Sequence, residues 1–411
     1  MADRVGADQL RRHALIIAGQ SPPSSDVADR QDGLPFLQGN AEFGEEVPQA
    51  RYECDVAPKQ SLPGDVLVSV RAPVGALNVS DRVYGIGRGL AAIRPRSEEL
   101  DERYLWWLMH TVRPQLSAVS VGSTYDAVTA DAVGGVRVRV PTTAEQQAIA
   151  DHLDAETARI DALITKRQRH VELLSERRAA TVASAVSGTG LDCPRSRTDL
   201  PWLHDLPARW RTVQIRKVAT MGTGHTPSRS VPEYWVDCTI PWVTTGEVAQ
   251  VRDDRATTIT ETRERISDLG LANSAAELHP AGTVVLSRTA SAGFSAILGS
   301  EMATSQDFVT WTPSDEIDAE YLLWCLRAMR ADLLGRLAMG STHKTIYMPD
   351  LEGLKVPLPT VDEQRQLVAE LRRRLRNIDD TVNALNRQIE LLRERRQALI
   401  TAAVTGELAV A

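Results

Sequence analysis

The sequence has few aromatic residues, no long hydrophobic run and only four cysteines, and the last two shortages each exclude a class of protein. No apolar stretch approaches the ~20 residues that a transmembrane helix needs, so no membrane partner is expected. Cys54, Cys193, Cys238 and Cys325 lie far apart, and no pair has the spacing of a metal site or a redox C-x-x-C motif. The N-terminus shows no clear signal-peptide layout. We therefore expect a cytoplasmic protein with reduced thiols.

Catalytic motifs are missing as well. The sequence contains no G-x-x-x-x-G-K-[ST], no G-x-S-x-G and no H-E-x-x-H. The segment GIGRG (85–89) resembles a dinucleotide fingerprint, but it lacks the third glycine and precedes a strand-like segment. Pro349-Asp350 with Glu352 and Lys355 resembles a metal-nuclease motif, but its spacing is wrong. The chain is therefore expected to be non-catalytic, with no cofactor and no metal of its own.

Length and charge give two further limits. A chain of 411 residues is expected to form two or more domains. Its net charge of -7 does not indicate the overall basic character of many DNA-binding proteins. A net acidic protein can still carry a local basic surface, so the charge counts mildly against nucleic-acid binding without excluding it.

What the sequence does contain is a duplication. ELLSERRAA (172–180) returns as ELLRERRQA (390–398), and the offset of 218 residues holds without gaps over a long region. A period this long indicates two copies of a domain rather than a solenoid of short repeats. Other segments that match at this offset are Gly64 with DVLVS and Gly282 with TVVLS, Gly122-Ser123-Thr124 and Gly340-Ser341-Thr342, and Pro141-Thr142 and Pro359-Thr360.

Each copy ends in a predicted long helix. Thr142-x-x-Glu145 and Thr360-x-x-Glu363 fit capping boxes at the start, and Gly188 and Gly406 fit C-terminal stops. Each helix would have about 43 residues and a length of roughly 65 Å. In the second helix a heptad seam is formed by Leu371, Leu375, Ile378, Val382, Leu385, Ile389 and Leu392. In the first helix Thr157 and Arg167 interrupt the seam of Leu153, Ile160, Ile164, Val171 and Leu174.

A long helix with a single apolar stripe needs a partner that covers the stripe. The other copy is the simplest partner. If a pseudo-twofold axis relates the two halves, the helices run antiparallel as a coiled coil that separates the two globular parts.

The predicted fold is therefore mixed α/β, with two similar globular α+β domains and two long antiparallel helices in a pseudo-twofold repeat. Strand-like runs such as GDVLVSVR and GTVVLSR alternate with turns that contain Gly and Pro. The expected limits are 1–141 for the first globular domain, 142–190 for the first long helix, 191–207 for a linker, 208–358 for the second domain and 359–408 for the second helix.

Two similar domains held apart by helices suit a ligand with two separated sites, and duplex DNA is such a ligand. Each candidate also has a structural interpretation: a helix cap for the Gly-Ser-Thr segments, a turn for Gly-His-Thr-Pro-Ser, and a solvated surface for the single arginines. The candidate DNA-binding residues are Arg71, Arg88, Ser123, Thr124, Tyr125, Ser228, Arg229, Arg288, Ser341, Thr342, His343 and Lys344.

The repeated Glu-Leu-Leu-x-Glu-Arg-Arg motif predicts two equivalent docking sites for one kind of partner. The alternative is a solvated charged face beside a seam in which Leu174 and Leu392 point inward. The candidate partner-binding residues are Glu172, Glu176, Arg177, Arg178, Glu390, Glu394, Arg395 and Arg396.

In this order and in duplicate, several segments resemble the specificity (S) subunit of type I restriction-modification systems. They are VPTTAEQQAIADHLD, LPTVDEQRQLVAELR, ELLSERR, ELLRERRQALITAAVTGEL and GHTPS. The first half departs more from the pattern of this family than the second half does, since RVRVPTT replaces the usual Pro-Leu-Pro.

The resemblance implies a non-catalytic subunit with two target-recognition domains, each of which reads one half of a bipartite DNA target. It implies that the coiled coil sets the spacer between the halves and docks two methyltransferase (M) subunits, with two restriction (R) subunits added. S-adenosylmethionine, ATP and Mg are then expected on the partner subunits. The alternative is a stand-alone duplex DNA-binding scaffold without modification partners.

Overall fold

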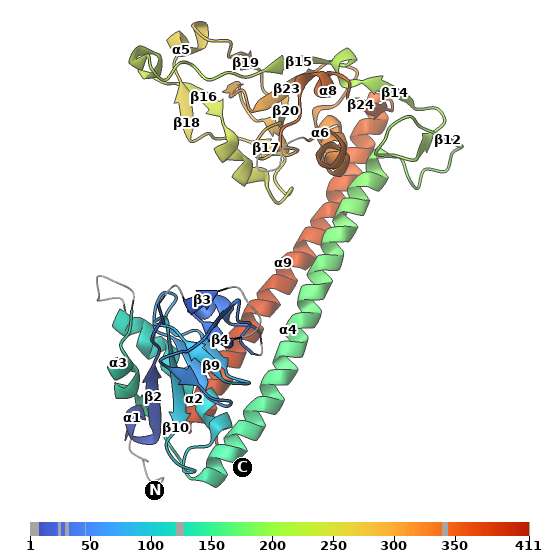
Figure 1. The fold of residues 1–411 in the computed structure, drawn as a ribbon. Coiled ribbons are helices and arrows are strands. Elements are labelled where there is room, and N and C mark those ends of the chain that lie inside the picture. Colours follow the sequence, from blue (N-terminus) through green and yellow to red (C-terminus); the bar gives the residue numbers. More distant parts are fainter. Residues whose placement is uncertain are drawn as a thin grey trace. The chain divides into compact units, whose positions relative to one another are not determined.

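The computed structural model describes residues 8–23, 26–28, 33–45, 47–120, 127–338 and 344–410. The chain forms two compact units (Figure 1). The first unit comprises Met1–Gln168 and Arg387–Ala411, and the second unit comprises Arg169–Asn386. Each unit thus holds one globular domain with a stretch of both long helices. Among the described helices, none combines the length and apolarity that crossing a membrane requires.

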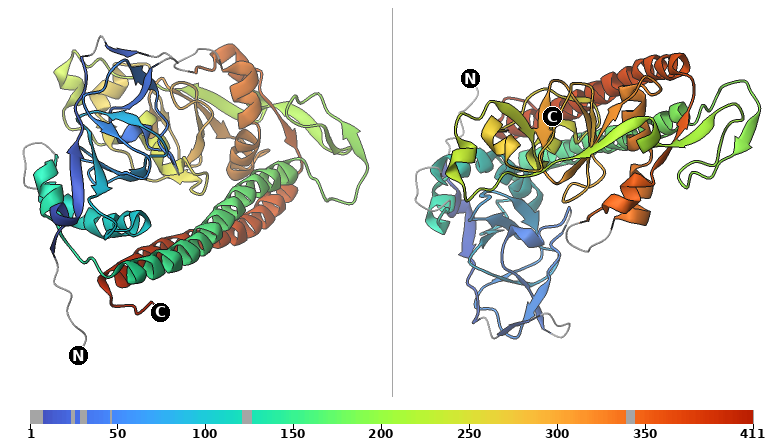
Figure 2. Two further views of the ribbon diagram at one scale, coloured as in Figure 1. Left: turned by 60° about the horizontal axis from the view of Figure 1, so that its bottom comes forward. Right: turned by 90° about the horizontal axis from the view of Figure 1, so that it is seen from above.

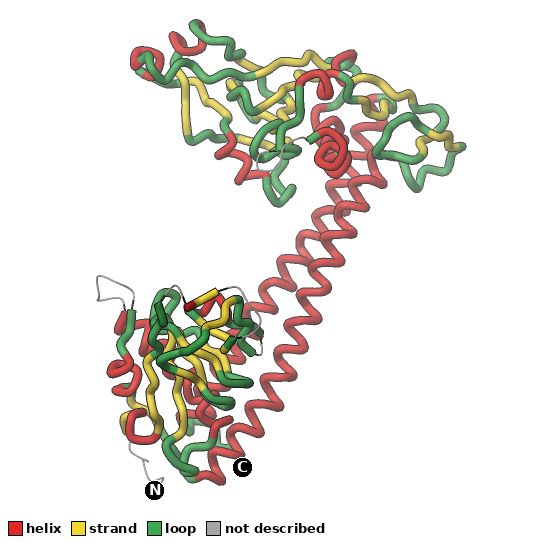
Figure 3. The backbone as a smooth tube through the Cα atoms, viewed as in Figure 1, coloured by secondary structure: helices red, strands yellow, loops and turns green. Residues whose placement is uncertain are grey.

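The globular domain of the first unit has two main sheets, coloured as strands in Figure 3. The four-stranded antiparallel sheet has the order β2 (Ala14–Ala18), β10 (Leu90–Pro95), β7 (Val66–Ser69) and β8 (Leu77–Val79). The five-stranded sheet has the order β3 (Val27–Ala28), β5 (Tyr52–Cys54), β4 (Leu34–Leu37), β9 (Tyr84–Ile86) and β6 (Gln60–Ser61). The other elements are β1 (Asp8–Gln9), which pairs with β11 (Arg137–Val138), α1 (Leu10–His13), η2 (Asn40–Glu42), α2 (Glu102–Ser120) and α3 (Ala130–Gly135).

The second unit repeats this plan. One sheet has the order β15 (Ala219–Thr223), β23 (Phe308–Pro313), β20 (Val284–Ser287), β21 (Ser295–Leu298) and β17 (Thr258–Ile259), and the other has β18 (Glu264–Ile266), β16 (Ile240–Val243), β22 (Met302–Thr304) and β19 (Leu278–His279). The remaining strands are β12 (Arg195–Arg197) with β13 (Asp205–Pro207), and β14 (Arg211–Gln214) with β24 (Lys355–Leu358). The helical elements are η3 (Ile215–Lys217), η4 (Pro232–Trp235), η5 (Thr245–Val251), α5 (Asp268–Ala272), α6 (Ala319–Ala328), α7 (Arg330–Asp332), η6 (Leu333–Leu337) and α8 (Met348–Glu352).

Most strand pairings of the two units correspond, although β17 beside β21 in the second unit and β3 beside β5 in the first have no counterpart. β2, β10, β7 and β8 occupy the places of β15, β23, β20 and β21, and the parallel pair β4–β9 corresponds to β16–β22. Gly64 and Gly282 precede β7 and β20 with φ of 88° and 87°, a backbone conformation that glycine adopts without strain. The predicted mixed α/β duplication is confirmed.

The long helices are α4 (Thr143–Val186) and α9 (Val361–Thr405), and they run antiparallel within each unit (Figures 1 and 2). In the second unit Leu174 packs with Ile378 and Leu385, and in the first unit Leu153 belongs to the same buried cluster as Ile400. Thr157 lies buried in the seam, and its hydroxyl donates to the carbonyl of residue 153 at 2.6 Å. A β-branched polar residue is therefore accommodated in the seam without an unpaired hydroxyl.

The predicted helix ends are confirmed in most details. At Thr360 the capping box forms in both directions, since the Glu363 amide donates to the threonine hydroxyl at 3.3 Å and the Glu363 carboxylate accepts from the Thr360 amide at 3.4 Å. At Thr142 only the threonine half forms, because the Glu145 carboxylate pairs with Arg139 instead. Gly188 and Gly406 follow the helices with positive φ, as expected of C-terminal stops.

The segment predicted as a linker, 191–207, contains the hairpin of β12 and β13. Arg195 in this hairpin donates to the carbonyls of Gly188 and Ser187 at 3.0 and 3.1 Å, and so satisfies free acceptors at the end of α4. The predicted domain limits stay predictions, because the two compact units divide the chain within each long helix.

One buried glutamine joins each long helix to its globular domain. The Gln146 side chain accepts from the Asp101 amide at 2.8 Å and donates to the carbonyls of Glu99 and Pro141, both at 2.7 Å. Gln364 repeats the three bonds with the Asp318 amide at 2.7 Å and the carbonyls of Glu316 and Pro359 at 3.0 Å. Both side chains are 0% exposed. The duplication therefore extends to single hydrogen bonds at the joint between domain and helix.

Replacing Gln146 by Leu is expected to destabilise the first unit by about 3 kcal/mol, because buried backbone groups of the adjoining domain lose their partners. Gln147 is exposed, so Gln147→Leu is the matched control and is expected to change stability by less than about 0.5 kcal/mol. Denaturant unfolding followed by circular dichroism measures both. Equal stabilities of the two variants would contradict the role of the glutamine.

Candidate nucleic-acid and partner surfaces

Two predicted arginines of the first unit meet at one surface pocket of about 280 Å³. Arg71 follows β7 and Arg88 lies in the turn between β9 and β10, and both are exposed. Ser21 and Asn40 line the same pocket, and the Ser21 hydroxyl accepts from the Arg88 amide at 3.3 Å. Within the described part of the chain neither guanidinium has a carboxylate partner. Glu42 lines the pocket too, and its carboxylate accepts from the Gly39 amide at 3.1 Å. The pocket therefore combines two guanidinium groups that have no ion-pair partner with one carboxylate and neutral hydrogen-bonding groups.

In the second unit the corresponding surface carries Gln306 where the first unit carries Arg88. The equivalence follows from the backbone, since the Val70 amide bonds to the carbonyl of Gly89 and the Arg288 amide to that of Asp307. Arg288 is half-buried, and its guanidinium donates to the carbonyl of Gln306 at 3.0 Å. This bond fixes the orientation of the Arg288 side chain. Gln306 was missed from sequence, although the 218-residue offset pairs it with Arg88.

Ser228 and Arg229 occupy a neighbouring loop of the second unit. The guanidinium of Arg229 lies 4.6 Å from the ring centre of Trp235 and 2.8 Å from the Glu264 carboxylate. The Ser228 hydroxyl lies 2.8 Å from that of Ser230. Both residues are exposed, but the charge of Arg229 is already compensated within the unit.

Six of the predicted residues in the Gly-Ser-Thr segments lie outside the described residues: Ser123, Thr124, Tyr125, Ser341, Thr342 and His343. The residues that follow each segment are described. Ala127 forms a β-bridge with Arg71, and the Ile346 amide donates to the carbonyl of Arg288 at 2.8 Å. A residue shortly after each segment thus contacts the backbone of the predicted arginine of its own unit. Lys344 is exposed.

The repeated motif on the long helices has a similar burial pattern in both copies. Leu174 is buried and Leu392 half-buried, as predicted, but the preceding Leu173 and Leu391 are 46% and 58% exposed. These two leucines were not among the predicted residues. The exposed charged residues of the two motifs are Glu172, Glu176, Arg177, Glu390, Glu394 and Arg395.

The last arginine of each motif faces the neighbouring helix instead. Arg178 pairs with Asp379 at 3.1 Å in the second unit, and Arg396 pairs with Asp161 at 3.0 Å in the first unit. These two residues are therefore occupied in the helix pair, and the surface open to a partner consists of the exposed leucine and the other charged residues.

The described residues contain no group of three or more potential metal ligands. Cys54 and Cys325 are buried, while Cys193 and Cys238 are half-buried. Burial raises the pKa of the Cys325 thiol well above its usual value, so this thiol stays protonated.

Comparison with known proteins agrees with this architecture. The family model of the type I restriction modification DNA specificity domain matches residues 52–173 and 207–391. The putative type I restriction enzyme MjaX specificity subunit of Methanocaldococcus jannaschii is 34% identical over 165 residues, which are 40% of this chain and 38% of the relative. The EcoR124I/EcoR124II specificity subunit of Escherichia coli is 22% identical over 187 residues, or 44% of each chain. The chain thus spans about two-fifths of the length of these curated relatives.

Two solved structures share the fold over nearly the full length. One, which concerns complex assembly and conformational transition of the type I R-M system, has a TM-score of 0.74 at 18% identity and covers 98% of both chains. The HsdS subunit from Thermoanaerobacter tengcongensis has a TM-score of 0.55 at 19% identity, with 99% of this chain and 98% of that chain covered. At this identity the likeness concerns the fold alone.

Proposed function

Because this chain belongs to the family of type I restriction-modification DNA specificity domains, we propose that it is the DNA-recognition subunit of a type I complex. The observation that carries the proposal is the duplicated recognition fold, with the same buried glutamine joining each copy to a long helix. One domain then reads each half of a bipartite target, and the helix pair sets the spacer between the halves.

The DNA-facing surface of the first domain is the pocket with Arg71 and Arg88. Two guanidinium groups without an ion-pair partner, beside Ser and Asn side chains, suit phosphate oxygens and guanine edges. In the second domain Arg288, Gln306 and Lys344 form the corresponding surface. Because an arginine stands in one domain where a glutamine stands in the other, the two half-sites are expected to differ.

The subunit itself catalyses no reaction in this proposal. Two methyltransferase subunits bind S-adenosylmethionine, and two restriction subunits use ATP and Mg²⁺, so the chain needs no cofactor of its own. The complex acts in the cytoplasm, where the DNA target lies. A stand-alone DNA-binding scaffold is not favoured, because exposed leucines in two matching charged motifs suit a surface that a partner covers.

The DNA surface is tested with Arg88→Ala in the complex with the methyltransferase subunits. The target is first identified by sequencing the methylated sites of the host genome. We expect binding to weaken about tenfold or more, in line with the ~1–3 kcal/mol of a well-placed arginine contact. Fluorescence anisotropy with DNA altered in either half-site should show that only discrimination at the first half-site is lost.

Arg82 is the matched control for this experiment, since it is exposed but already paired with Asp81 at 3.0 Å. Arg82→Ala is expected to bind like the wild type. Loss of discrimination at the second half-site in Arg88→Ala would contradict the assignment of one half-site to each domain.

The docking surface is tested with Leu173→Asp and Leu391→Asp. A buried unpaired carboxylate disfavours docking, so each single variant is expected to bind one methyltransferase subunit and the double variant none. Native mass spectrometry counts the subunits. Leu163 is 46% exposed, like Leu173, and lies on the same helix outside the motif, so Leu163→Asp should retain two subunits. Two subunits on the double variant would place the docking surface elsewhere.

A further inference from the structure

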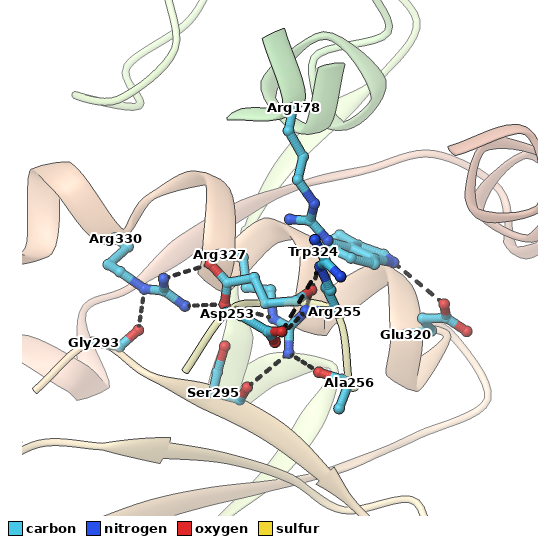
Figure 4. A network of polar contacts seen from close by, with 11 residues as sticks. Arg178, Asp253, Arg255, Ala256, Gly293, Ser295, Glu320, Trp324, Arg327 and Arg330 are labelled. Carbon is cyan, nitrogen blue, oxygen red and sulfur yellow. Dashed lines mark hydrogen bonds and ion pairs between the residues drawn. The ribbon is translucent and has the colours of Figure 1, made fainter. Parts of the chain in front are cut away.

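In the second unit, the loop between η5 and β17 is held by a bidentate ion pair. The Arg330 guanidinium donates to both carboxylate oxygens of Asp254, at 2.6 and 2.7 Å. Asp254 adopts a φ of 60°, which costs free energy in a residue other than glycine and persists only when its surroundings enforce it. Arg330 also donates to the carbonyl of Gly293 at 2.8 Å, and Figure 4 shows this contact.

Two more arginines converge on the same loop (Figure 4). The backbone carbonyl of Asp254 accepts from Arg327 at 2.6 Å and from Arg178 at 2.7 Å. The Arg327 side chain is almost fully buried and also donates to the carbonyl of Ala256 at 2.6 Å. Burial lowers the pKa of Arg327 to about 10, and the nearby Asp254 charge opposes that shift. This buried cation therefore depends on the loop for its compensation.

The same loop reaches both long helices. Arg178 belongs to α4, and its Nε donates to Asp379 of α9 at 3.1 Å. The neighbouring Arg255 of the loop donates to Asn383 of α9 at 2.6 Å. One short loop of the recognition domain is thus bonded to α6, α4 and α9, in addition to the joint made by Gln364.

The first unit has the same helix positions but a different set of contacts. Arg396 corresponds to Arg178 at the offset of 218 residues. Within α2 and α6 the offset is 217, which aligns Tyr104 with Tyr321, and there His110 corresponds to Arg327 and Arg113 to Arg330. His110 is held between Trp106 and Trp107, and burial lowers its pKa to about 4, with Arg396 and Arg113 adding to the shift. Among the described residues of this unit, no carboxylate bridges these positions as Asp254 does.

We propose that Asp254 is a positioning residue that locks the second recognition domain onto the helix pair and thereby restricts the spacer length that the subunit accepts. This inference rests on the proposed function, since it gives the loop a role in DNA recognition without DNA contact. The first domain, joined to the helices without such a loop, tolerates more rotation about its α2 contacts. Charge-assisted bidentate bonds of this kind are stronger and more directional than neutral ones.

The test measures binding of the complex with methyltransferase subunits to targets whose spacer is native, one base pair shorter or one longer. Asp254→Asn and Asp254→Gly both remove the carboxylate charge, and Asn and Gly tolerate the positive φ, so neither variant adds backbone strain to the loop. In both variants the preference for the native spacer is expected to fall about fivefold, close to the effect of 1 kcal/mol on an equilibrium. The bases preferred in each half-site should not change.

Asp237 is the matched control, because it is exposed and has a comparable positive φ of 50° in the same unit. Asp237→Asn is expected to keep the wild-type preference. If the Asp254 variants bind all three spacers more weakly by the same factor, or keep the wild-type preference, this inference is wrong but the proposed function still holds. A wild-type complex without preference for any bipartite target would overturn the proposed function as well.

Discussion

Each long helix carries one apolar stripe, and the architecture depends on covering that stripe. Helices of 44 and 45 residues cannot leave a row of leucines and isoleucines in water, even where Thr157 and Arg167 interrupt the row on α4. In each unit a stretch of α4 packs against a stretch of α9, so each helix serves as the cover of the other. The seam is made of similar side chains in both units because the sequence on both helices derives from one repeated pattern.

The joints between domain and helix turn this seam into a scaffold for recognition. A buried amide that makes three hydrogen bonds narrows the range of orientations of the domain on its helix, since a large rotation leaves buried groups unpaired. The same joint occurs in both units, so each domain presents an equivalent surface to its ligand. DNA specificity can then vary through exposed side chains without a change in the joint between domain and helix. The presence of Gln306 in the second domain at the position of Arg88 in the first illustrates this.

The features that could be predicted from the sequence are those that depend on local periodicity or on the repeat. The heptad seam, the capping box at Thr360 and the glycine stops depend on near neighbours along the chain, and the offset of 218 residues revealed the duplication. Contacts between residues far apart in the chain could not be predicted in this way. Asp254 and Arg330 are 76 residues apart, and nothing in either local sequence marks them as partners. Leu173 was also missed as a partner-binding residue, because the motif was interpreted through its charged side chains, although the seam already placed the adjacent Leu174 inward.

In the proposed function the two halves of the chain are equivalent readers of DNA. Replacing residues 1–141 with a second copy of residues 208–358, followed by sequencing of the methylated sites of the host genome, tests this equivalence. Both domains meet their helices through the same glutamine bonds, so the graft is expected to assemble. The grafted chain is expected to methylate a target that is an inverted repeat of the second half-site. Methylation of the original asymmetric target by the grafted chain would contradict it.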